Sequence, residues 1–346
     1  MTERRQSGDD ALKVADVAER LLGQHVTAVP LTSAGRNSRI YRVTCATGER
    51  FALKLYPPIS TETVDRRAAE LKALTLLEEV GIKPVPRLIA TDERSNCSVL
   101  SWIDGEPPDE VTPADLASAI AFLASVHAAR HHSWASEQSR AVESCLSVRE
   151  LRRQVEQRLH DLVAIEGEPD LSSFLEQTVR PTWQRSVGRA ESRASQAGIQ
   201  LDVDLPRCLQ TLAPSDFGFH NALRLANGSL AFVDFEYFGW DDPVKLTADL
   251  LLHPATALEA WARDQLRSGL GAVYADDLRF DVRLATLLPL FAVRWTLIML
   301  NEFMPRGWRR RVLAGEKDSW AAAKARQLER ARAFLASSAM WLAAGC

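Results

Sequence analysis

The pattern of apolar residues changes once along this chain of 346 residues, near Asp104-Gly105, and that change limits the folds open to it. Before this point, short runs of alternating or apolar residues are separated by turns, as in β-strands. One longer segment among them has apolar residues at helical spacing. After it, helical periods dominate. A typical domain length of about 150 residues also favours two structural units over one. The sequence therefore predicts an α+β, bilobal fold, with a small β-rich lobe over residues 1–103 and a large, mainly helical lobe over residues 104–346.

The smaller lobe is expected to begin with an amphipathic helix over residues 11–22, followed by strands. The expected strands cover residues 39–44, 51–56, 87–91 and 97–103. Between the second and third of these, a helix is expected to start at a Thr61 or Thr63 cap and to end near Val80, before Gly81.

The larger lobe is expected to open with a helix over residues 112–131, in which Pro113 takes the first helical position. Residues 134–206 contain 12 acidic residues and nine arginines, and their helical period predicts an insert of two helices joined by a loop at 167–169. Residues 211–242 return to short β-like runs, and helices are expected from there to the end.

Composition excludes several classes of function. The net charge of -3 leaves no basic excess for a nucleic-acid backbone. The five cysteines have neither metal-knuckle nor redox spacing. The N-terminus has no apolar secretory segment, and the most apolar stretch, 284–300, is interrupted by Pro289 and Arg294 and predicts a buried core helix. We therefore expect a cytoplasmic protein that binds neither nucleic acid nor membrane.

The sharpest motif lies in the β-like segment of the larger lobe. Asp216 is followed five residues later by Asn221, and Asp234 ends the apolar run 230–233. Phosphoryl transfer needs such a set, because one carboxylate accepts the proton of the attacking hydroxyl while an amide oxygen and a second carboxylate hold Mg²⁺. The alternative is a surface hairpin whose Asp and Asn side chains only form turns.

The smaller lobe supplies a matching cation. Lys54 stands in the apolar strand 51–56, where an ammonium group is costly unless it meets an anion. Phosphate would serve, and so would Glu70 on the next helix. The alternatives are an edge-strand lysine that points to water and a glutamate on a solvated helix face.

A turn ahead of Lys54 contains Gly35, Asn37 and Ser38 among other small residues. Small residues allow backbone N–H groups to approach phosphates. A single glycine is weak support, however, and a plain hairpin turn explains the segment equally well.

The chain resembles the aminoglycoside phosphotransferase and choline kinase family, which has a protein-kinase-like fold. The resemblance rests on the order of four features: the strand lysine, the helical glutamate, Asp-x4-Asn and Asp234-Phe235-Glu236. Three further features resemble this family more than protein kinases. They are Glu236 where a protein kinase has glycine, the Gly239-Trp240-Asp241-Asp242-Pro243 element, and Val126-His127 before the insert. A protein kinase is also disfavoured because no activation-loop segment separates Asp234 from Pro243.

The resemblance implies a role for each residue. Asp216 would be the catalytic base, Asn221 and Asp234 the magnesium ligands, and Lys54 the contact to the nucleotide phosphates, oriented by Glu70. The implied nucleotide site also includes Gly35, Asn37 and Ser38, and an inter-lobe hinge at 99–103 with Val99 and Ser101. Pro214-Ser215 replaces the family's usual His-Gly, a departure that concerns the fine geometry of the loop more than catalysis. His220 is interpreted as structural, and Glu236 either as a loop hydrogen-bonding residue or as a ligand of a second metal.

These features predict a phosphotransferase that uses ATP (or another nucleoside triphosphate) and Mg²⁺ to phosphorylate a hydroxyl group of a small molecule, as a monomer or homodimer. The alternative is a nucleotide-binding regulatory pseudokinase. The mildly acidic insert and arginine-rich later helices favour a neutral or acidic acceptor, such as a sugar, a nucleoside-like compound or a glycan intermediate. The resemblance adds an antibiotic-type metabolite to these acceptors. Arg294 is expected to form a buried or rim salt bridge with a carboxylate such as Glu302 or Asp242, with acceptor contact as the alternative.

Overall fold

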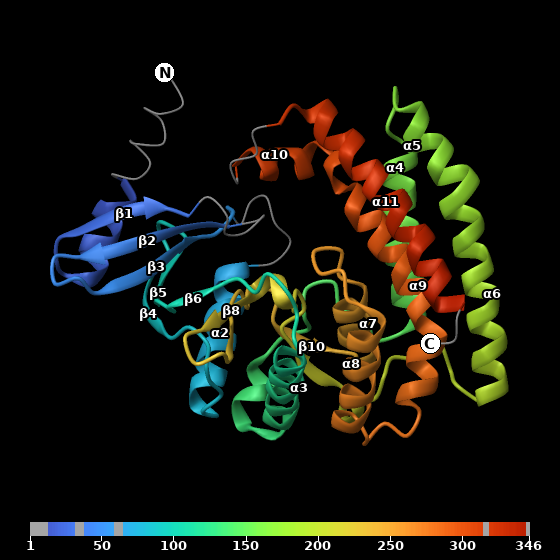
Figure 1. Cartoon of the computed structure of the whole chain (residues 1–346), viewed down its shortest axis with the longest axis horizontal. Coiled ribbons are helices and arrows are strands. Elements are labelled where there is room, and N and C mark those ends of the chain that lie inside the picture. The colour runs from blue at the N-terminus through green and yellow to red at the C-terminus, as the bar shows by residue number, and fades with distance from the viewer. Residues whose placement is uncertain (1–12, 32–37, 59–64, 314–317, 344–346) are drawn as a thin grey trace.

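The computed structural model describes residues 13–31, 38–58, 65–313 and 318–343, and its elements form two lobes (Figure 1). Strands β1 to β5 make up the smaller lobe on the left of Figure 1, and the larger lobe on the right is mainly helical. The predicted α+β, bilobal fold is therefore confirmed.

The smaller lobe is built on an antiparallel five-stranded sheet. The strand order is β1 (Val26–Pro30), β2 (Arg39–Cys45), β3 (Arg50–Leu55), β5 (Cys97–Ser101) and β4 (Leu88–Asp92). Apolar residues of the helix at 13–22 pack on this sheet and enclose a small core of their own. Strand β5 ends at Ser101, two residues earlier than expected, because the chain leaves the sheet at Trp102.

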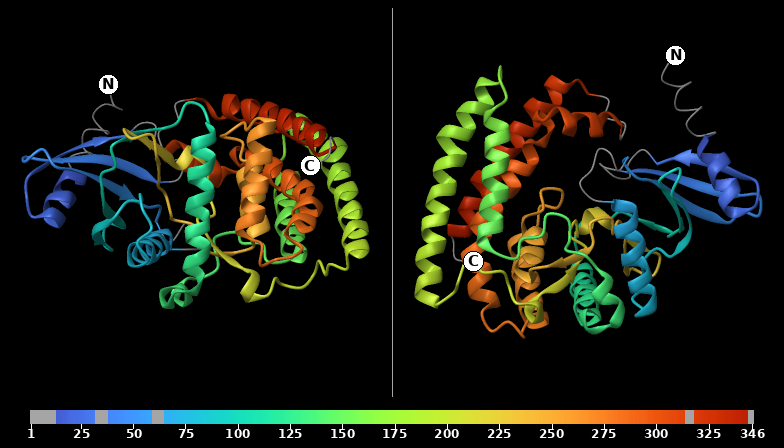
Figure 2. Two further views of the ribbon diagram at one scale, coloured as in Figure 1. Left: turned by 60° about the horizontal axis from the view of Figure 1, so that its bottom comes forward. Right: turned by 180° about the vertical axis from the view of Figure 1, so that it is seen from behind.

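Helix α2 (Arg66–Glu79) connects the two lobes. Its N-cap is Asp65, whose side chain accepts a hydrogen bond from the backbone N–H of Ala68 at 2.9 Å. The predicted caps, Thr61 and Thr63, lie outside the described residues. The buried leucines of α2 belong to the core of the larger lobe and not to that of the sheet, and Figure 2 shows α2 between the sheet and the rest of the molecule.

Two small sheets in the larger lobe carry the loops that contain Asp216 and Asp234. In one, β6 (Gly105–Glu106), β8 (Ala222–Leu225) and β9 (Leu230–Phe232) pair antiparallel. In the other, β7 (Thr211–Ala213) pairs with β10 (Gly239–Asp241). Gly105 is needed in β6 because a Cβ atom there would lie 2.9 Å from the backbone oxygen of Arg224. The chain that leaves the smaller lobe thus pairs at once with the hairpin of the predicted catalytic segment.

The helices of the larger lobe surround α9 (Phe280–Met299), which packs against α4, α6, α7 and α11. The stretch 280–303 is long and apolar enough to cross a membrane, but 72% of its most apolar window is buried within the protein. The predicted buried core helix is therefore confirmed. The other helices are α3 (Pro113–Ala128), α4 (Val148–Val163), α5 (Pro169–Phe174), α6 (Arg180–Ala197), α7 (Pro243–Leu252), α8 (Ala260–Val273), α10 (Pro305–Leu313) and α11 (Trp320–Ala343).

The insert contains the two predicted helical segments, but the second has an irregular start. A π-helical turn at Leu175–Val179 joins α5 to α6, so the chain is helical from Pro169 to Ala197. Before the insert, α3 begins as predicted, with Pro113 after a capping box between Thr112 and Asp115.

Candidate active site

Five predicted site residues come together where the two lobes meet. Lys54 lies on β3 and Glu70 on α2, both in the N-terminal part of the chain. Asp216 lies in the loop after β7, Asn221 ends the short 3₁₀ helix η6 (Phe219–Asn221), and Asp234 follows β9. Asp234, after β9, contacts Lys54 of the smaller lobe, and Asn221 joins the strand before Asp234 to the loop of Asp216.

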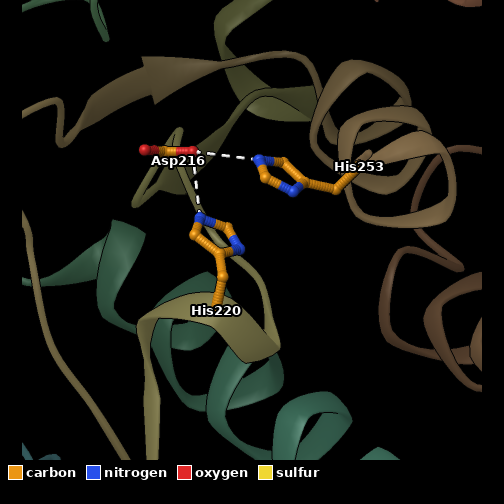
Figure 3. Close-up of side chains that lie close together, drawn as sticks. All are labelled: Asp216, His220 and His253. Carbon is orange, nitrogen blue, oxygen red and sulfur yellow. Dashed lines mark hydrogen bonds and ion pairs between the residues drawn. The ribbon is translucent and has the colours of Figure 1, made fainter. Parts of the chain in front are cut away.

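The Asp216 carboxylate is held by two histidines (Figure 3). Its Oδ1 atom lies 3.2 Å from Nε2 of His220 and 3.4 Å from Nε2 of His253, which follows α7. The two imidazole rings are stacked, with centroids 3.9 Å apart and planes 6° from parallel. The preceding residue, Ser215, has a left-handed backbone with φ of 68°, which turns the chain into this arrangement.

Asp216 is ionised and partly open to solvent. Burial alone would raise the pKa of its carboxyl group, but the hydrogen bonds from His220 and His253 outweigh this effect and hold the pKa well below its usual range. The side chain is 32% exposed. Among the described residues, no hydrogen-bond donor contacts the second oxygen, Oδ2. The carboxylate therefore keeps one oxygen for a further partner.

Asn221 ties the loop of Asp216 to the strand before Asp234. Its side-chain Nδ2 donates to the backbone oxygen of Asp216 at 2.8 Å, and its own backbone oxygen accepts from Val233 N–H at 2.9 Å. The side-chain amide is thereby oriented with its nitrogen toward the loop, and its oxygen is left to accept.

Lys54 faces three carboxylates. Its Nζ lies 2.7 Å from Glu70, 2.6 Å from Asp234 and 3.1 Å from Glu236. Glu70 also accepts hydrogen bonds from the Tyr56 hydroxyl and from the backbone N–H of Phe235, at 2.7 and 2.9 Å. The lysine is 2% exposed, so the edge-strand alternative is wrong. The ion pair instead joins β3 and α2 to the loop after β9.

Glu236 is fully buried, and both of its oxygens have partners. Ser38 donates to Oε2 at 2.7 Å, and Arg66 donates to Oε1 at 2.8 Å. These contacts fit the interpretation of Glu236 as a hydrogen-bonding residue. Ser38 therefore contacts a carboxylate of the other lobe, and its two predicted companions, Gly35 and Asn37, lie outside the described residues.

The two predicted hinge residues lie within the sheet. Val99 is fully buried in β5, paired with Leu53 on β3 and with Ala90 on β4. Ser101 donates its backbone N–H to the oxygen of Arg87 at 2.9 Å, and its hydroxyl accepts from Arg87 N–H at 2.9 Å. These groups already have partners within the sheet, and Trp102 is the first residue after β5.

Sequence reasoning missed two residues of this region, His253 and Arg66. His253 follows α7, and its contact with Asp216 depends on how that helix packs. Arg66 lies in the first turn of α2, and its partner Glu236 is far away in the sequence, so no local pattern marks it as a buried arginine that requires an acidic partner.

Arg294 was correctly expected to form a salt bridge, but its partners differ from those predicted. It is 3% exposed and donates to Glu143 at 2.8 Å and to Gln154 at 2.9 Å, with Asp249 at 3.5 Å. The predicted partners are paired elsewhere, Asp242 with Arg283 and Glu302 with Arg311.

A bilobal fold with a buried lysine–glutamate pair and an Asp–Asn–Asp set at the lobe junction defines a kinase-like protein. Comparison with family models gives a match over residues 27–283, and the chain belongs to the phosphotransferase enzyme family. The predicted resemblance to aminoglycoside phosphotransferases and choline kinases is therefore confirmed. A comparison with curated proteins gives no match.

Solved structures share the fold at low sequence identity. A spectinomycin phosphotransferase, APH(9)-Ia, in complex with ADP and spectinomycin matches with a TM-score of 0.62 and 12% identity, covering 94% of this chain and 98% of that one. Choline kinase LicA from Streptococcus pneumoniae gives 0.56 and 14%, covering 94% and 98%. Macrolide 2'-phosphotransferase MphH from Brachybacterium faecium gives 0.55 and 18%, covering 93% and 97%.

Proposed function

We propose that this protein is an ATP- and Mg²⁺-dependent phosphotransferase that acts on a hydroxyl group of a small molecule in the cytoplasm. The observation that carries the proposal is the convergence of Lys54, Asp216 and Asp234 from different elements on the junction of the lobes. The matched spectinomycin phosphotransferase with ADP and the choline kinase support an adenine nucleotide and a small acceptor.

In this proposal Asp216 is the general base. Its low pKa keeps the carboxylate ionised at neutral pH, and Oδ2 is the oxygen that accepts the proton of the acceptor hydroxyl. A weak base is sufficient, because phosphoryl transfer proceeds through a loose transition state in which positioning and charge stabilisation dominate.

Lys54 would contact the nucleotide phosphates, with Glu70 holding it in place. The nucleobase would contact the backbone from Trp102 onward. The side-chain oxygens of Asn221 and Asp234 fit Mg²⁺, since this ion prefers hard oxygen ligands and the described residues around Lys54 include more carboxylates than cations. When bound, Mg²⁺ would hold the phosphates and neutralise charge that develops on them.

The acceptor is proposed only as a small hydroxylated compound, such as a sugar, a nucleoside-like molecule or an antibiotic-type metabolite. The arginines of the later helices give less support to an anionic acceptor than the sequence suggested, because several of them bind protein groups. Arg283 and Arg311 pair with carboxylates, and Arg294 is buried among its own partners.

The test is a screen of the purified protein with ATP and Mg²⁺ over hydroxylated metabolites, with mass-spectrometric detection of a phosphorylated product. With an acceptor identified, Asp216→Ala should lower kcat by about 10²–10⁴-fold while leaving nucleotide affinity nearly unchanged, because the base contacts the acceptor. A variant within about threefold of wild type would exclude Asp216 as the base. Tight nucleotide binding without any phosphorylated product would favour the regulatory pseudokinase.

A further inference from the structure

His253 contacts the proposed base from a separate element, the segment after α7, and its proton can be placed from its hydrogen bonds. Nδ1 of His253 accepts a hydrogen bond from the backbone N–H of Ala255 at 3.2 Å. In a neutral imidazole one nitrogen carries the proton and the other accepts. Burial lowers the pKa of His253 and so favours the neutral ring. The proton therefore lies on Nε2, which faces Oδ1 of Asp216.

The ring of His253 also packs against two aromatic rings. His220 stacks on it, and Trp295 makes a T-shaped contact with it, with centroids 4.7 Å apart and planes at 75°. Trp295 is itself fixed, because its indole N–H donates to Asp249 at 2.8 Å. His253 therefore has little freedom to turn its N–H away from the carboxylate.

His220 completes a pair of donors to the same oxygen. Its Nδ1 is buried and has no hydrogen-bond partner within the described part of the chain, which favours the tautomer with the proton on Nε2, toward Asp216. The imidazole occupies the space beside Gly218, where a Cβ atom would lie 2.7 Å from Nδ1.

Two N–H groups that converge on Oδ1 satisfy that oxygen and fix the plane of the carboxylate, while Oδ2 keeps its lone pairs. We propose that His253, with His220 stacked on it, is a positioning residue that aims Oδ2 of Asp216 at the acceptor hydroxyl. This inference rests on the proposed function, because it assumes that Asp216 is the base. It adds a residue from outside the catalytic segment to the transfer step.

The same three side chains could in principle hold a transition metal, since their ligand atoms lie within 4.8 Å of one another. The tautomer of His253 argues against this use. A metal needs the lone pair of Nε2, which would move the proton to Nδ1, where Ala255 N–H already donates. With its proton on Nε2, His253 faces Oδ1 of Asp216 at 3.4 Å and accepts from Ala255 at Nδ1. Metal binding at Nε2 would instead place the Nδ1 proton against the Ala255 N–H.

The experiment compares two substitutions of His253 in the full chain with the acceptor found by the screen. His253→Phe keeps an aromatic ring between His220 and Trp295 but removes the donor, and His253→Gln returns an amide N–H. We expect His253→Phe to lower kcat by about 10–10²-fold, because a small misplacement of a reacting group is costly, with an unchanged nucleotide KM. His253→Gln should recover most of the loss. The matched control, His160→Phe at an exposed position of α4, should leave kcat unchanged.

A kcat for His253→Phe equal to that of wild type would overturn the proposal, and so would a glutamine variant as slow as the phenylalanine variant. A second measurement does not depend on turnover. NMR of protein with ¹⁵N-labelled histidine should show the Nε2–H tautomer at His253, and an Nδ1–H tautomer there would overturn the inference. A wild-type protein that transfers no phosphate would instead contradict the proposed function. The NMR tautomer would still show whether the N–H of His253 faces Asp216.

Discussion

At the scale of single residues, the buried charges around Lys54 do not balance. Within the described part of the chain, Lys54 and Arg66 face Glu70, Asp234 and Glu236, so the carboxylates of this cluster exceed its cations by one. Burial lowers the pKa of Lys54, but the three carboxylates outweigh burial and raise it well above its usual value. Burial and the other two carboxylates raise the pKa of Asp234, against the effect of Lys54. An added cation would relieve this excess of negative charge.

Asp234→Ala should therefore remove most of the effect of Mg²⁺ on nucleotide binding. In the wild type we expect nucleotide affinity to be higher with Mg²⁺ than without it, because the ion would join Asp234 to the phosphates. Isothermal titration calorimetry with and without Mg²⁺ measures the ratio directly. In Asp234→Ala that ratio should approach one, whereas Asp216→Ala should keep the wild-type ratio. If Asp234→Ala retained the full enhancement, the ligand assignment would be wrong.

The residues that the sequence singled out and those that it missed differ in where their partners lie. Lys54, Asp216 and Asp234 stand at fixed positions relative to local strands, so pattern and motif order were sufficient to select them. The contact of His253 with Asp216 and that of Arg66 with Glu236 join segments far apart in the chain. The left-handed backbone of Asp234, with φ of 69°, follows no local pattern either, since aspartate adopts it only in particular surroundings.

At the scale of secondary-structure elements, Arg294 ties α9 to the insert and to α7. Arg294→Met should lower the free energy of unfolding by about 3–5 kcal/mol, because removing one member of a buried ion network leaves its partners uncompensated. The nucleotide KM should not change, since the partners Glu143, Gln154 and Asp249 lie outside the proposed nucleotide site. Chemical denaturation together with the KM distinguishes the two effects. A stable variant with a raised acceptor KM would restore the alternative of acceptor contact.

A second prediction at this scale concerns His127, which links the end of α3 to β7. Its Nδ1 lies 2.9 Å from the hydroxyl of Thr211, and its ring contacts Tyr274 edge-on. Burial, aided by the charge of Arg130, lowers the pKa of His127 from 6.5 to about 4. As the pH falls below 6.5, the unfolded chain takes up a proton that the folded chain rejects until near pH 4, so stability is lost across this window.

The size of this effect follows from the pKa difference. Between pH 7 and pH 5, His127 should reduce the free energy of unfolding by about 2 kcal/mol. Urea unfolding at the two pH values, in the wild type and in His127→Gln, isolates this contribution, because glutamine keeps a polar group near Thr211 but does not titrate. Equal pH dependence in the two proteins would mean that His127 is protonated as readily in the folded state as in the unfolded one.

At the scale of the whole molecule, the periodicity of the sequence was sufficient to predict the lobes, because strands and helices differ in period along long stretches of chain. It did not predict that the leucines of α2 join the core of the larger lobe, or that β6 pairs with β8. Both depend on contacts between segments far apart in sequence, which single-chain periodicity does not encode. The π-helical turn at Leu175–Val179 likewise has no counterpart in the apolar pattern.

Part of the sheet of the smaller lobe encloses a small core of its own, whereas Leu100 of β5 and the leucines of α2 belong to the large core. We therefore expect polar contacts between α2 and the loop after β9 to contribute to the cooperative unfolding of the two lobes. Arg66 on α2 and Glu236 after β9 form such a contact, with side chains 5% and 0% exposed. The pair Arg50–Asp104 also lies near the junction, but its side chains are 41% and 69% exposed. The first pair is buried and also contacts Lys54 and Ser38 through Glu236, whereas the second is exposed, so the two compare a buried ion network with a surface ion pair.

Arg66→Met should destabilise the protein by about 3–5 kcal/mol, because it leaves the buried charge of Glu236 short of a partner, whereas Arg50→Met should cost about 1 kcal/mol or less. We also expect the transition of Arg66→Met in differential scanning calorimetry to broaden or split, as the smaller lobe unfolds before the larger one. In the double-mutant cycle with Glu236→Gln, the two effects should be strongly non-additive. If the two arginine variants were equally stable, burial of this pair would contribute nothing to the coupling of the lobes, and α2 packing alone would have to account for it.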